Sequence, residues 1–341
     1  MPHTPAPTKP AATRNDVARL AGVSTAVVSY VVNGSKRVSP ATETRVREAI
    51  AMLGYRPNRA ARALRLGSSE TLGMVVPDST NPFFASLAHA VEQSAAERGY
   101  DLLMANSDGS LALERRHIDH FATRRVDGVF VCSSIVEPDL RALEQADIPA
   151  VLLNQYVATP GVDSVSVDLA GGSRLAVEHL AAHGHRTIGL VIGTNTDNTV
   201  DAREVGWRET IARLGLVAGP VLRQPFNRSG GYDAGRWLLD GAVRPTALFV
   251  GSDRQAVGLL KALHEAGVRV PEEIAIVSFD GSEDAEYSWP PLSTVAQPIE
   301  EMARAAVSAL IDGEGEKHHR VFEPTLIRRA SCGCAESETV A

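Results

Sequence analysis

From Thr71 onward, short apolar runs alternate with stretches of helical spacing. The strand-like runs are TLGMVV, YDLLMA, GVFVC, PAVLL, SVSV, TIGLVI, TALFVG and IAIVSF, and helical patterns lie between them, for example at 82–97, 172–182, 203–214 and 255–266. This alternation predicts an α/β body with parallel sheets that are covered on both faces. A single sheet of this size would be wide, so we expect two lobes. TLGMVVP and TIGLVIG are the predicted first strands of two equivalent lobes.

The chain length also favours several domains. Its 341 residues exceed the roughly 250–300 at which single hydrophobic cores stop growing. No apolar run reaches the ~18 residues that a membrane span needs. The first twelve residues lack the apolar centre of a signal peptide, so they are interpreted as a disordered leader of a cytoplasmic, nucleoid-associated protein.

A helix, a glycine turn and a second helix are predicted over residues 14–33, which is the pattern of a helix-turn-helix. Apolar residues at helical spacing form the expected inner faces: Val17, Leu20 and Ala21 in the first helix, and Val28, Val31 and Val32 in the second. Thr13 and Ser24 are placed to cap these helices, and Gly22 ends the first. Ser39-Pro40 opens a third helix whose expected buried stripe is Val46, Ala49, Ile50 and Leu53.

Charge separates this head from the body. Residues 1–68 contain eleven Lys and Arg against three Asp and Glu, whereas the remainder contains 23 against 38. The net charge of −7 therefore combines a basic head with an acidic body. A basic head with helical apolar spacing is typical of a unit that contacts phosphate.

The head resembles the lactose-repressor (LacI) family of bacterial transcription regulators. The resemblance is carried by DVARLAGVS, VSYVVNGS, RVSPAT, LGYRPNRAARAL and LGMVVPDSTNPFF, and it continues through almost the whole chain. It implies that the second helix reads DNA and that the NRAARAL segment is a hinge helix that inserts a leucine into the minor groove. The DNA-binding residues implied or placed in this way are Thr13, Ser24, Thr25, Ala26, Ser29, Tyr30, Asn33, Arg37, Asn58, Arg59, Ala61 and Leu64.

Two residues depart from the family pattern. Val27 stands where the family often has threonine, and Tyr30 stands where it often has arginine. Tyrosine cannot make the bidentate contact of arginine to guanine, so the preferred operator is expected to differ there. The alternative for Tyr30 is a packing residue at the rim of the helix.

The resemblance implies a body like a periplasmic sugar-binding protein, and open α/β sheets independently place ligands at the carboxyl ends of their strands. The effector-binding candidates are Asp78, Phe83, Phe84, Asn154, Arg203, Phe226, Asp253 and Asp280. Arg203 and Phe226 match family positions, and the others follow strand-like runs. Charged, amide and aromatic groups together suit a polyol.

For several candidates a structural role is the alternative. Arg203 and Asp280 could pair with each other, one of Phe83 and Phe84 is expected in the core, and Asp253 could cap a helix. Ser252 replaces an asparagine that is common in the family, which puts a sugar contact there in doubt.

No cofactor, metal site or catalytic constellation is predicted, since the sequence lacks a P-loop, G-x-G-x-x-G, H-E-x-x-H or nucleophile elbow. Three histidines, at 179, 183 and 185, are interpreted as helix-end residues. Cys332 and Cys334 form a C-x-C pair, for which metal or redox chemistry is the alternative. They are interpreted as incidental surface thiols, because the sequence places no His or second Cys pair near them.

The expected function is that of a DNA-binding transcriptional regulator, taken to be a repressor, whose affinity for a palindromic operator is controlled by a small-molecule effector such as a sugar. The chain is expected to act as a homodimer and not as an enzyme. The alternatives are a transport-type solute-binding protein and an activator of the same fold. The expected domains are the leader (1–12), the head (13–57), the hinge (58–70), the core (71–330) and a flexible tail (331–341). Within the core, the N-lobe takes about 71–167 plus 298–330, and the C-lobe about 168–297.

Overall fold

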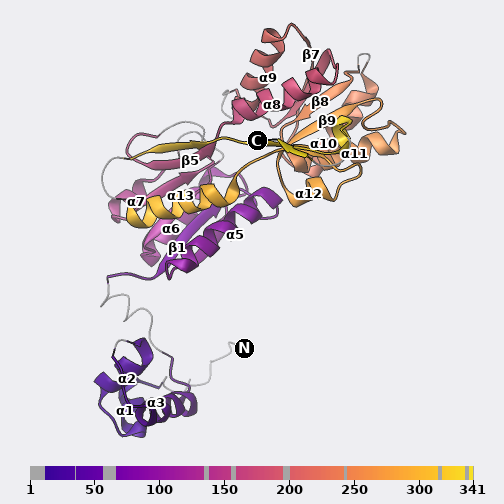
Figure 1. The fold of residues 1–341 in the computed structure, drawn as a ribbon. Coiled ribbons are helices and arrows are strands. Elements are labelled where there is room, and N and C mark those ends of the chain that lie inside the picture. Colours follow the sequence, from indigo (N-terminus) through magenta and orange to yellow (C-terminus); the bar gives the residue numbers. More distant parts are fainter. Residues whose placement is uncertain are drawn as a thin grey trace, which may run out of the picture. The chain divides into compact units, whose positions relative to one another are not determined.

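The computed structural model describes residues 12–34, 36–56, 67–133, 138–154, 159–194, 200–241, 244–313, 317–334 and 338–340. It divides into two compact units, Met1–Ser69 and Glu70–Ala341. The first is the helical head and the second is the α/β body (Figure 1). No helix in the described part of the chain is long and apolar enough to cross a membrane.

The head contains α1 (Arg14–Ala21), α2 (Thr25–Asn33) and α3 (Pro40–Leu53). Thr13, Ser24 and Ser39 cap the three helices through their hydroxyl groups. Gly22 ends α1 with φ 65°, a left-handed conformation that glycine adopts at little cost. These caps fix where each of the three helices begins.

The small core of the head forms around Val17, Val28 and Val46, which are fully buried. Two expected core positions are wrong, since Leu20 is 50% exposed and Leu53 is 36% exposed. The buried stripe of α1 passes through Val17, Ala18 and Ala21, so Leu20 lies to one side of it. Val32 packs against the core from a half-buried position.

The N-lobe is a six-stranded parallel sheet in the order β11-β5-β4-β3-β1-β2. Its strands are β1 (Thr71–Val76), β2 (Asp101–Asn106), β3 (Gly128–Val131), β4 (Ala150–Leu153), β5 (Asp163–Val167) and β11 (His319–Phe322). Helices α5 (Pro82–Glu97) and α13 (Ile299–Asp312) cover one face, and α6 (Leu111–Arg124) and α7 (Arg141–Gln145) cover the other (Figure 1).

The C-lobe is a seven-stranded sheet in the order β13-β12-β10-β9-β8-β6-β7. Its strands are β6 (Thr187–Ile192), β7 (Val217–Arg223), β8 (Ala247–Val250), β9 (Ala275–Asp280), β10 (Ser293–Ala296), β12 (Thr325–Arg328) and β13 (Glu338–Val340). The strands from β6 to β10 are parallel, and β12 and β13 join antiparallel. Its helices are α8 (Leu169–Ala182), α9 (Ala202–Arg213), α10 (Arg228–Asp240), α11 (Asp253–Glu265) and α12 (Glu283–Glu286).

The predicted equivalence of the two lobes is visible in the strand orders. The N-lobe runs β2-β1-β3-β4-β5 and the C-lobe runs β7-β6-β8-β9-β10. Each sheet therefore has its first strand next to an edge strand, and β1 and β6 are the two runs whose sequences echo each other. The expected fold class, a helix-turn-helix head on a two-lobed α/β body with parallel sheets, is confirmed.

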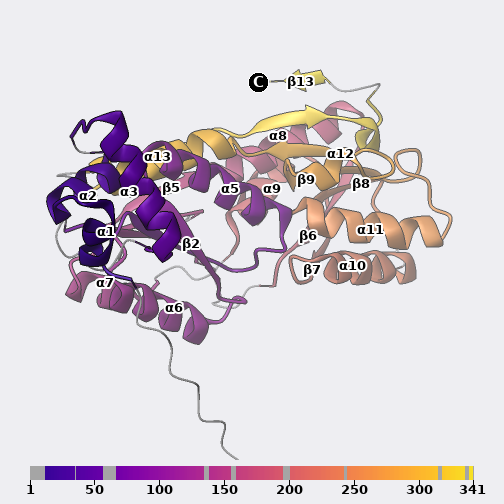
Figure 2. The same ribbon diagram turned by 90° about the horizontal axis from the view of Figure 1, so that it is seen from below.

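The chain crosses between the lobes three times: between β5 and α8, between β10 and α13, and between β11 and β12 (Figure 2). Two expected boundaries are wrong here. β12 pairs with β10 in the C-lobe sheet, so the returning N-lobe segment does not extend to residue 330. The segment after 330 is not a free tail, because Ser331 and Cys332 are buried and β13 pairs with β12.

Candidate DNA-reading helix and effector site

The outward face of α2 carries the residues expected to read DNA. Thr25, Ala26 and Asn33 are exposed, and Ser29 and Tyr30 are half-buried. The Asn33 amide donates to Ser29 Oγ at 3.0 Å. Lys36 Nζ lies 5.2 Å from the centre of the Tyr30 ring, so the ring is covered on one side by a cation. The outward face thus carries three polar side chains, one alanine and one tyrosine.

Thr13 and Ser24 cap the N-termini of α1 and α2. Thr13 and Asp16 form a reciprocal capping box in which the Thr13 amide and hydroxyl donate to the Asp16 carboxylate. These hydrogen bonds from Thr13 lower the pKa of Asp16. Ser24 Oγ accepts from the Val27 amide at 3.3 Å. Both caps leave helix N-termini at the surface, where anions are favoured.

The remaining DNA-binding candidates lie around the loop and the hinge. Arg37 is exposed on the segment before α3. The hinge candidates Asn58, Arg59, Ala61 and Leu64 lie outside the described residues.

Arg203 is the central cation of the C-lobe strand ends. It lies in the first turn of α9, after β6, and is 7% exposed. Its Nε and Nη2 donate to the Asp201 carboxylate at 2.9 and 2.8 Å, and its Nη1 donates to the Gly251 carbonyl at 2.8 Å. Arg203 therefore pairs with Asp201, and its expected alternative partner, Asp280, is not the residue that holds it.

The Asp201 carboxylate is an ionised partner for this guanidinium. Burial raises its pKa, but the charge and hydrogen bonds of Arg203 outweigh burial and lower it below the ordinary value. Asp201 also caps α9 by accepting from the Arg203 amide. The pair fixes the guanidinium before any ligand arrives.

Phe226 gives the site its apolar wall. It follows β7 and is half-buried, and the Arg203 guanidinium carbon lies 4.6 Å from the centre of its ring. The ring fits because Gly193 has no side chain: a Cβ there would lie 2.1 Å from the Phe226 ring. A glycine at the end of β6 thus gives room to the aromatic side chain from the neighbouring strand.

Asp280 ends β9 beside this group. It is 7% exposed, and its carboxylate accepts from Gln297 Nε2 at 3.1 Å. Burial, with the nearby charge of Asp253, raises the pKa of Asp280 well above its ordinary value, and Arg203 only partly opposes this. The backbone has φ 120° at Asp280, a strained conformation of the kind that clusters at functional sites.

Asp253 has a supporting role behind the site. Its two carboxylate oxygens accept from the hydroxyls of Ser278, Thr294 and Ser282 and from the Ser282 amide, at 2.5–2.9 Å. Four hydrogen bonds use the accepting capacity of a carboxylate. This arrangement favours a supporting role for Asp253 over a direct ligand contact. The helix cap at this position is Ser252, which accepts from the Gln255 amide.

The N-lobe contributes residues from the ends of β1 and β4. Asp78 follows β1, and its carboxylate accepts from Arg254 Nη1 on α11 at 2.6 Å. Thr80 donates to the same carboxylate through its backbone N–H and its hydroxyl, and the hydroxyl accepts from Arg254 Nη2. This contact links the two lobes. Asn154 follows β4 with φ 60°, and its backbone N–H donates to the Val165 carbonyl.

The two phenylalanines of the TNPFF segment divide their roles. Phe83 is 3% exposed and belongs to the core, as was expected for one of the two. This burial favours a packing role for Phe83 over an effector contact. Phe84 is half-buried, and its ring packs edge to face on Phe83 at 5.1 Å. Phe84 is the member of the pair with surface left for a ligand.

Sequence reasoning missed three residues that organise these strand ends: Asp201, Arg254 and Gln297. Arg254 and Gln297 act through partners that only the fold brings near. Asp201 could have been found from its D-x-R spacing with Arg203 at the start of a helix. Two shallow pockets, of about 200 and 230 Å³, lie elsewhere, beside α6 and α7 and near the end of α13.

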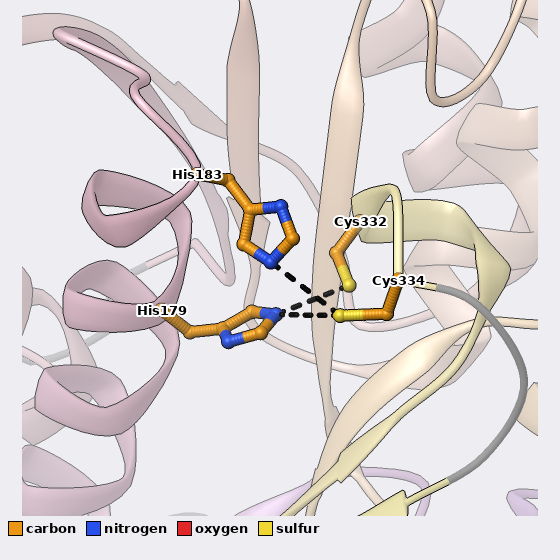
Figure 3. Close-up of side chains that lie close together, drawn as sticks. All are labelled: His179, His183, Cys332 and Cys334. Atoms are coloured by element: carbon orange, nitrogen blue, oxygen red, sulfur yellow. Dashed lines mark hydrogen bonds between the residues drawn. The ribbon is translucent and has the colours of Figure 1, made fainter.

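The interpretation of the C-terminal cysteines as surface thiols is wrong. Cys332 is 1% exposed, and Cys334 is half-buried. The imidazoles of His179 and His183 lie beside both thiols (Figure 3). The fold brings together two pairs that are about 150 positions apart in the sequence.

Comparison with known proteins matches both parts of the chain. A model described as "Bacterial regulatory proteins, lacI family" matches residues 13–58, and a "Periplasmic binding protein-like domain" matches 177–332. The HTH-type transcriptional repressor PurR of Photobacterium profundum is 34% identical over 94% of this chain and 98% of its own length. The ribose operon repressor of Escherichia coli is 36% identical over 92% of this chain and 94% of its own.

This chain belongs to the lacI family. Among solved structures, the Lac repressor dimer bound to operator and the anti-inducer ONPF matches this lacI-family chain with a TM-score of 0.83 at 28% identity, over 94% of this chain and 99% of that one. A complex of the transcriptional regulator CelR with cellobiose matches with a TM-score of 0.68 at 32% identity, over 94% of this chain and 99% of that one. The lacI-family protein is thus a DNA-binding transcriptional regulator with an effector-binding body.

Proposed function

We propose that this chain is a repressor that binds a palindromic operator as a homodimer, and that a sugar or sugar derivative held by Arg203, Phe226, Asp280, Asn154 and Phe84 controls its operator affinity. The effector acts only through a difference in its affinity for two arrangements of the lobes. The protein acts in the cytoplasm, at the nucleoid, and does not convert the effector chemically.

The arrangement around Arg203 carries the proposal. A fixed guanidinium, an aromatic face and a carboxyl group stand together at the carboxyl ends of β6, β7 and β9. Polyols combine hydroxyls, which need charged or amide partners, with apolar C–H faces, which pack on aromatic rings. Relatives point the same way: one is a ribose operon repressor, and one solved structure contains cellobiose.

The homodimer is supported by the outer edge of the N-lobe sheet. β2 is an edge strand on which Leu103 and Met104 are 39% and 47% exposed. An exposed apolar edge is a pairing surface unless it is covered or blunted. A solved relative is described as a dimer on operator. Two-fold symmetry of the protein requires matching half-sites in the DNA.

The proposal can be tested by a gel-shift titration of the purified full chain on its own promoter region. We expect half-saturation at a concentration about 10³-fold or more below that for random DNA of equal length. A panel of pentoses, hexoses, disaccharides and purine bases is then added, and we expect one sugar class to shift the half-saturation point. Equal affinity for promoter and random DNA would refute the proposal that the protein binds a specific operator.

Two further readouts separate the components of the proposal. A promoter–reporter fusion should become more active when the gene is deleted, and reduced activity would instead identify an activator. The sugar that shifts DNA binding should be recovered unchanged after incubation with the protein. A new product in chromatography would contradict the non-enzymatic role.

A further inference from the structure

Two histidines and two cysteines converge at one end of the C-lobe. His179 and His183 lie one helical turn apart at the C-terminal end of α8, and Cys332 and Cys334 follow β12. One potential ligand atom from each residue lies within 4.8 Å of all the others. Figure 3 shows the four side chains pointing toward a common centre from two separate segments.

The distances between ligand atoms fit a tetrahedral ion. With metal–nitrogen bonds of about 2.0–2.1 Å and metal–sulfur bonds of about 2.3 Å, neighbouring nitrogen and sulfur ligands are about 3.6 Å apart. The Nε2 of His179 lies 3.1 Å from Cys332 Sγ and 3.5 Å from Cys334 Sγ, and the Nε2 of His183 lies 3.4 Å from Cys334 Sγ. Small adjustments of the side chains suffice to admit an ion.

The backbone around the four residues favours the same geometry. Gly333, between the cysteines, has φ 90°, and this left-handed turn lets both thiols face α8. His183 is the C-cap of α8, so the negative end of the helix dipole lies beside the cluster and favours a cation. Ser293 Oγ lies 3.0 Å from Cys332 Sγ and can hydrogen-bond a thiolate.

The imidazole of His179 is suited to act as a ligand. Its Nε2 faces both sulfur atoms, and Arg328 is a nearby charge. A neutral imidazole is the form that binds metals. The charge of Arg328 does not oppose an ion that carries two thiolates, because Zn²⁺ and two thiolates together are neutral.

We propose that His179, His183, Cys332 and Cys334 bind one Zn²⁺ ion in a closed, tetrahedral Cys₂His₂ site. Softer thiolate ligands with imidazoles select Zn²⁺ over Mg²⁺ or Ca²⁺, and four protein ligands leave no open position for a substrate. The role is therefore structural: the ion joins the end of α8 to the segment after β12, immediately beyond two of the three crossings between the lobes. Binding releases a proton from each thiol that was protonated.

The test is the metal content of full-length protein purified under reducing conditions without a chelator. Wild-type chain should retain about one Zn²⁺ per chain. The double variant His183→Gln/Cys334→Ser removes the two less buried ligands, and it should bind Zn²⁺ at least about 100-fold more weakly in competition with a chromogenic chelator. The matched control is His117→Gln/His120→Gln on α6, a histidine pair with ring centres 6.3 Å apart. It should retain wild-type affinity.

Two further measurements make the outcome unambiguous. Far-UV circular dichroism of the metal-free proteins checks that all three chains are folded, and Zn²⁺ should raise the melting temperature of wild type and control only. Replacement by Co²⁺ should give the visible absorption of a tetrahedral thiolate–imidazole site. Wild-type protein that binds no Zn²⁺, a double variant that binds it as tightly as wild type, or a Cys332–Cys334 disulfide in the isolated protein would each overturn the proposal.

Discussion

Single residues at the C-lobe strand ends are held in place before a ligand binds. Arg203 has three of its guanidinium nitrogens engaged by Asp201 and Gly251, and its face lies on Phe226. Preorganisation of this kind lowers the entropy that binding must otherwise overcome. These contacts fix the orientation of the guanidinium, so its rotamer is set before a ligand binds.

Replacement of Arg203 by lysine tests this frame. Lysine keeps the charge, but it lacks the planar guanidinium that donates to Asp201 and Gly251 at the same time. We expect Arg203→Lys to raise the effector concentration for half-response by roughly 10–100-fold, since a charged hydrogen bond contributes about 1.5–3 kcal/mol. Operator affinity without effector should stay unchanged in the same gel-shift titration. Arg213→Lys, at the exposed end of the same helix, serves as the control, and an equal shift in that variant would argue against a specific role.

Tyr30 should determine base preference at one operator position. Its ring is half-buried under Lys36, yet it stands on the outward face of α2. Tyr30→Arg should create a preference for guanine worth about 1–3 kcal/mol at that base pair, because arginine binds guanine through two hydrogen bonds. Selection from a randomised operator library measures the change. An unaltered consensus would mean that Tyr30 packs at the rim and does not contact bases.

Asp280 should make stability depend on pH. Its pKa is raised above 3.8 by burial and by Asp253, so the folded state binds its proton more tightly than the unfolded state. The resulting stabilisation is complete below the ordinary pKa and is lost as pH rises through the raised value. Asp280→Asn keeps an acceptor for Gln297 and removes this loss, so it should increase stability at pH 7 by about 1–3 kcal/mol.

Urea unfolding of wild type and Asp280→Asn from pH 4 to pH 8 measures this effect. The gain should grow with pH, and part of the pH dependence should remain because burial also raises the pKa of Asp253. Asp233→Asn, on the exposed side of α10, should leave the profile unchanged. A gain that is independent of pH would show that the effect is not electrostatic.

At the scale of elements, sequence patterns located most of the buried strands. All eight strand-like runs correspond to strands; seven of these strands are largely buried, and β2 was found although it is an exposed edge strand, because its run DLLMA is mostly apolar. β10 was missed although it is buried, since two of its four residues, Ser293 and Thr294, are polar. β7 was missed since it is an exposed edge strand that contains Gly219 and Pro220. β12 and β13 were missed because such short strands are defined by their partners, which are β10 for β12 and β12 for β13.

The same limit applies to the sites. Arg203 and Asp280 could be found because each follows a strand and matches a chemical expectation. The Asp78–Arg254 contact joins residues 176 positions apart, and the His179–Cys332 contact joins residues 153 positions apart. No local pattern encodes such pairs. The hydrogen bonds of Asp253 could not be predicted for the same reason, since their donors come from β9, β10 and the turn before α12.

The edge of the N-lobe sheet should be required for dimerisation. β2 presents Leu103 and Met104, whereas β7 is the equivalent edge strand of the C-lobe. Leu103→Glu/Met104→Glu should convert the dimer to a monomer in sedimentation experiments, because burying two carboxylates at an interface is costly. Val217→Glu on β7, where the native valine is 59% exposed, is the control and should remain dimeric. A double variant that stays dimeric would place the interface elsewhere.

At the scale of the whole body, the two lobes are connected by three chain crossings and by polar contacts between strand ends. The Arg254 side chain from α11 reaches Asp78 and Thr80 of the N-lobe. Burial raises the pKa of Asp78, but hydrogen bonds from Arg254 and Thr80 outweigh burial and lower the pKa below its ordinary value, so the carboxylate is ionised. This contact forms between parts that must move relative to each other if the lobes open. It therefore biases the equilibrium between two arrangements without needing to touch the effector.

Removal of this contact should change the effector response through the lobe equilibrium. Arg254→Ala and Asp78→Ala should each shift the half-response concentration by about 3–30-fold, in the same direction, since coupling of about 1–2 kcal/mol is typical for a well-formed, partly exposed pair in a network. The double variant should shift it no further than the larger single shift, because both changes remove one interaction. Isothermal titration with the effector and gel-shift titration give the two affinities for the cycle. Additive shifts would show that the two residues act separately, and unchanged values in both singles would exclude this contact from the switch.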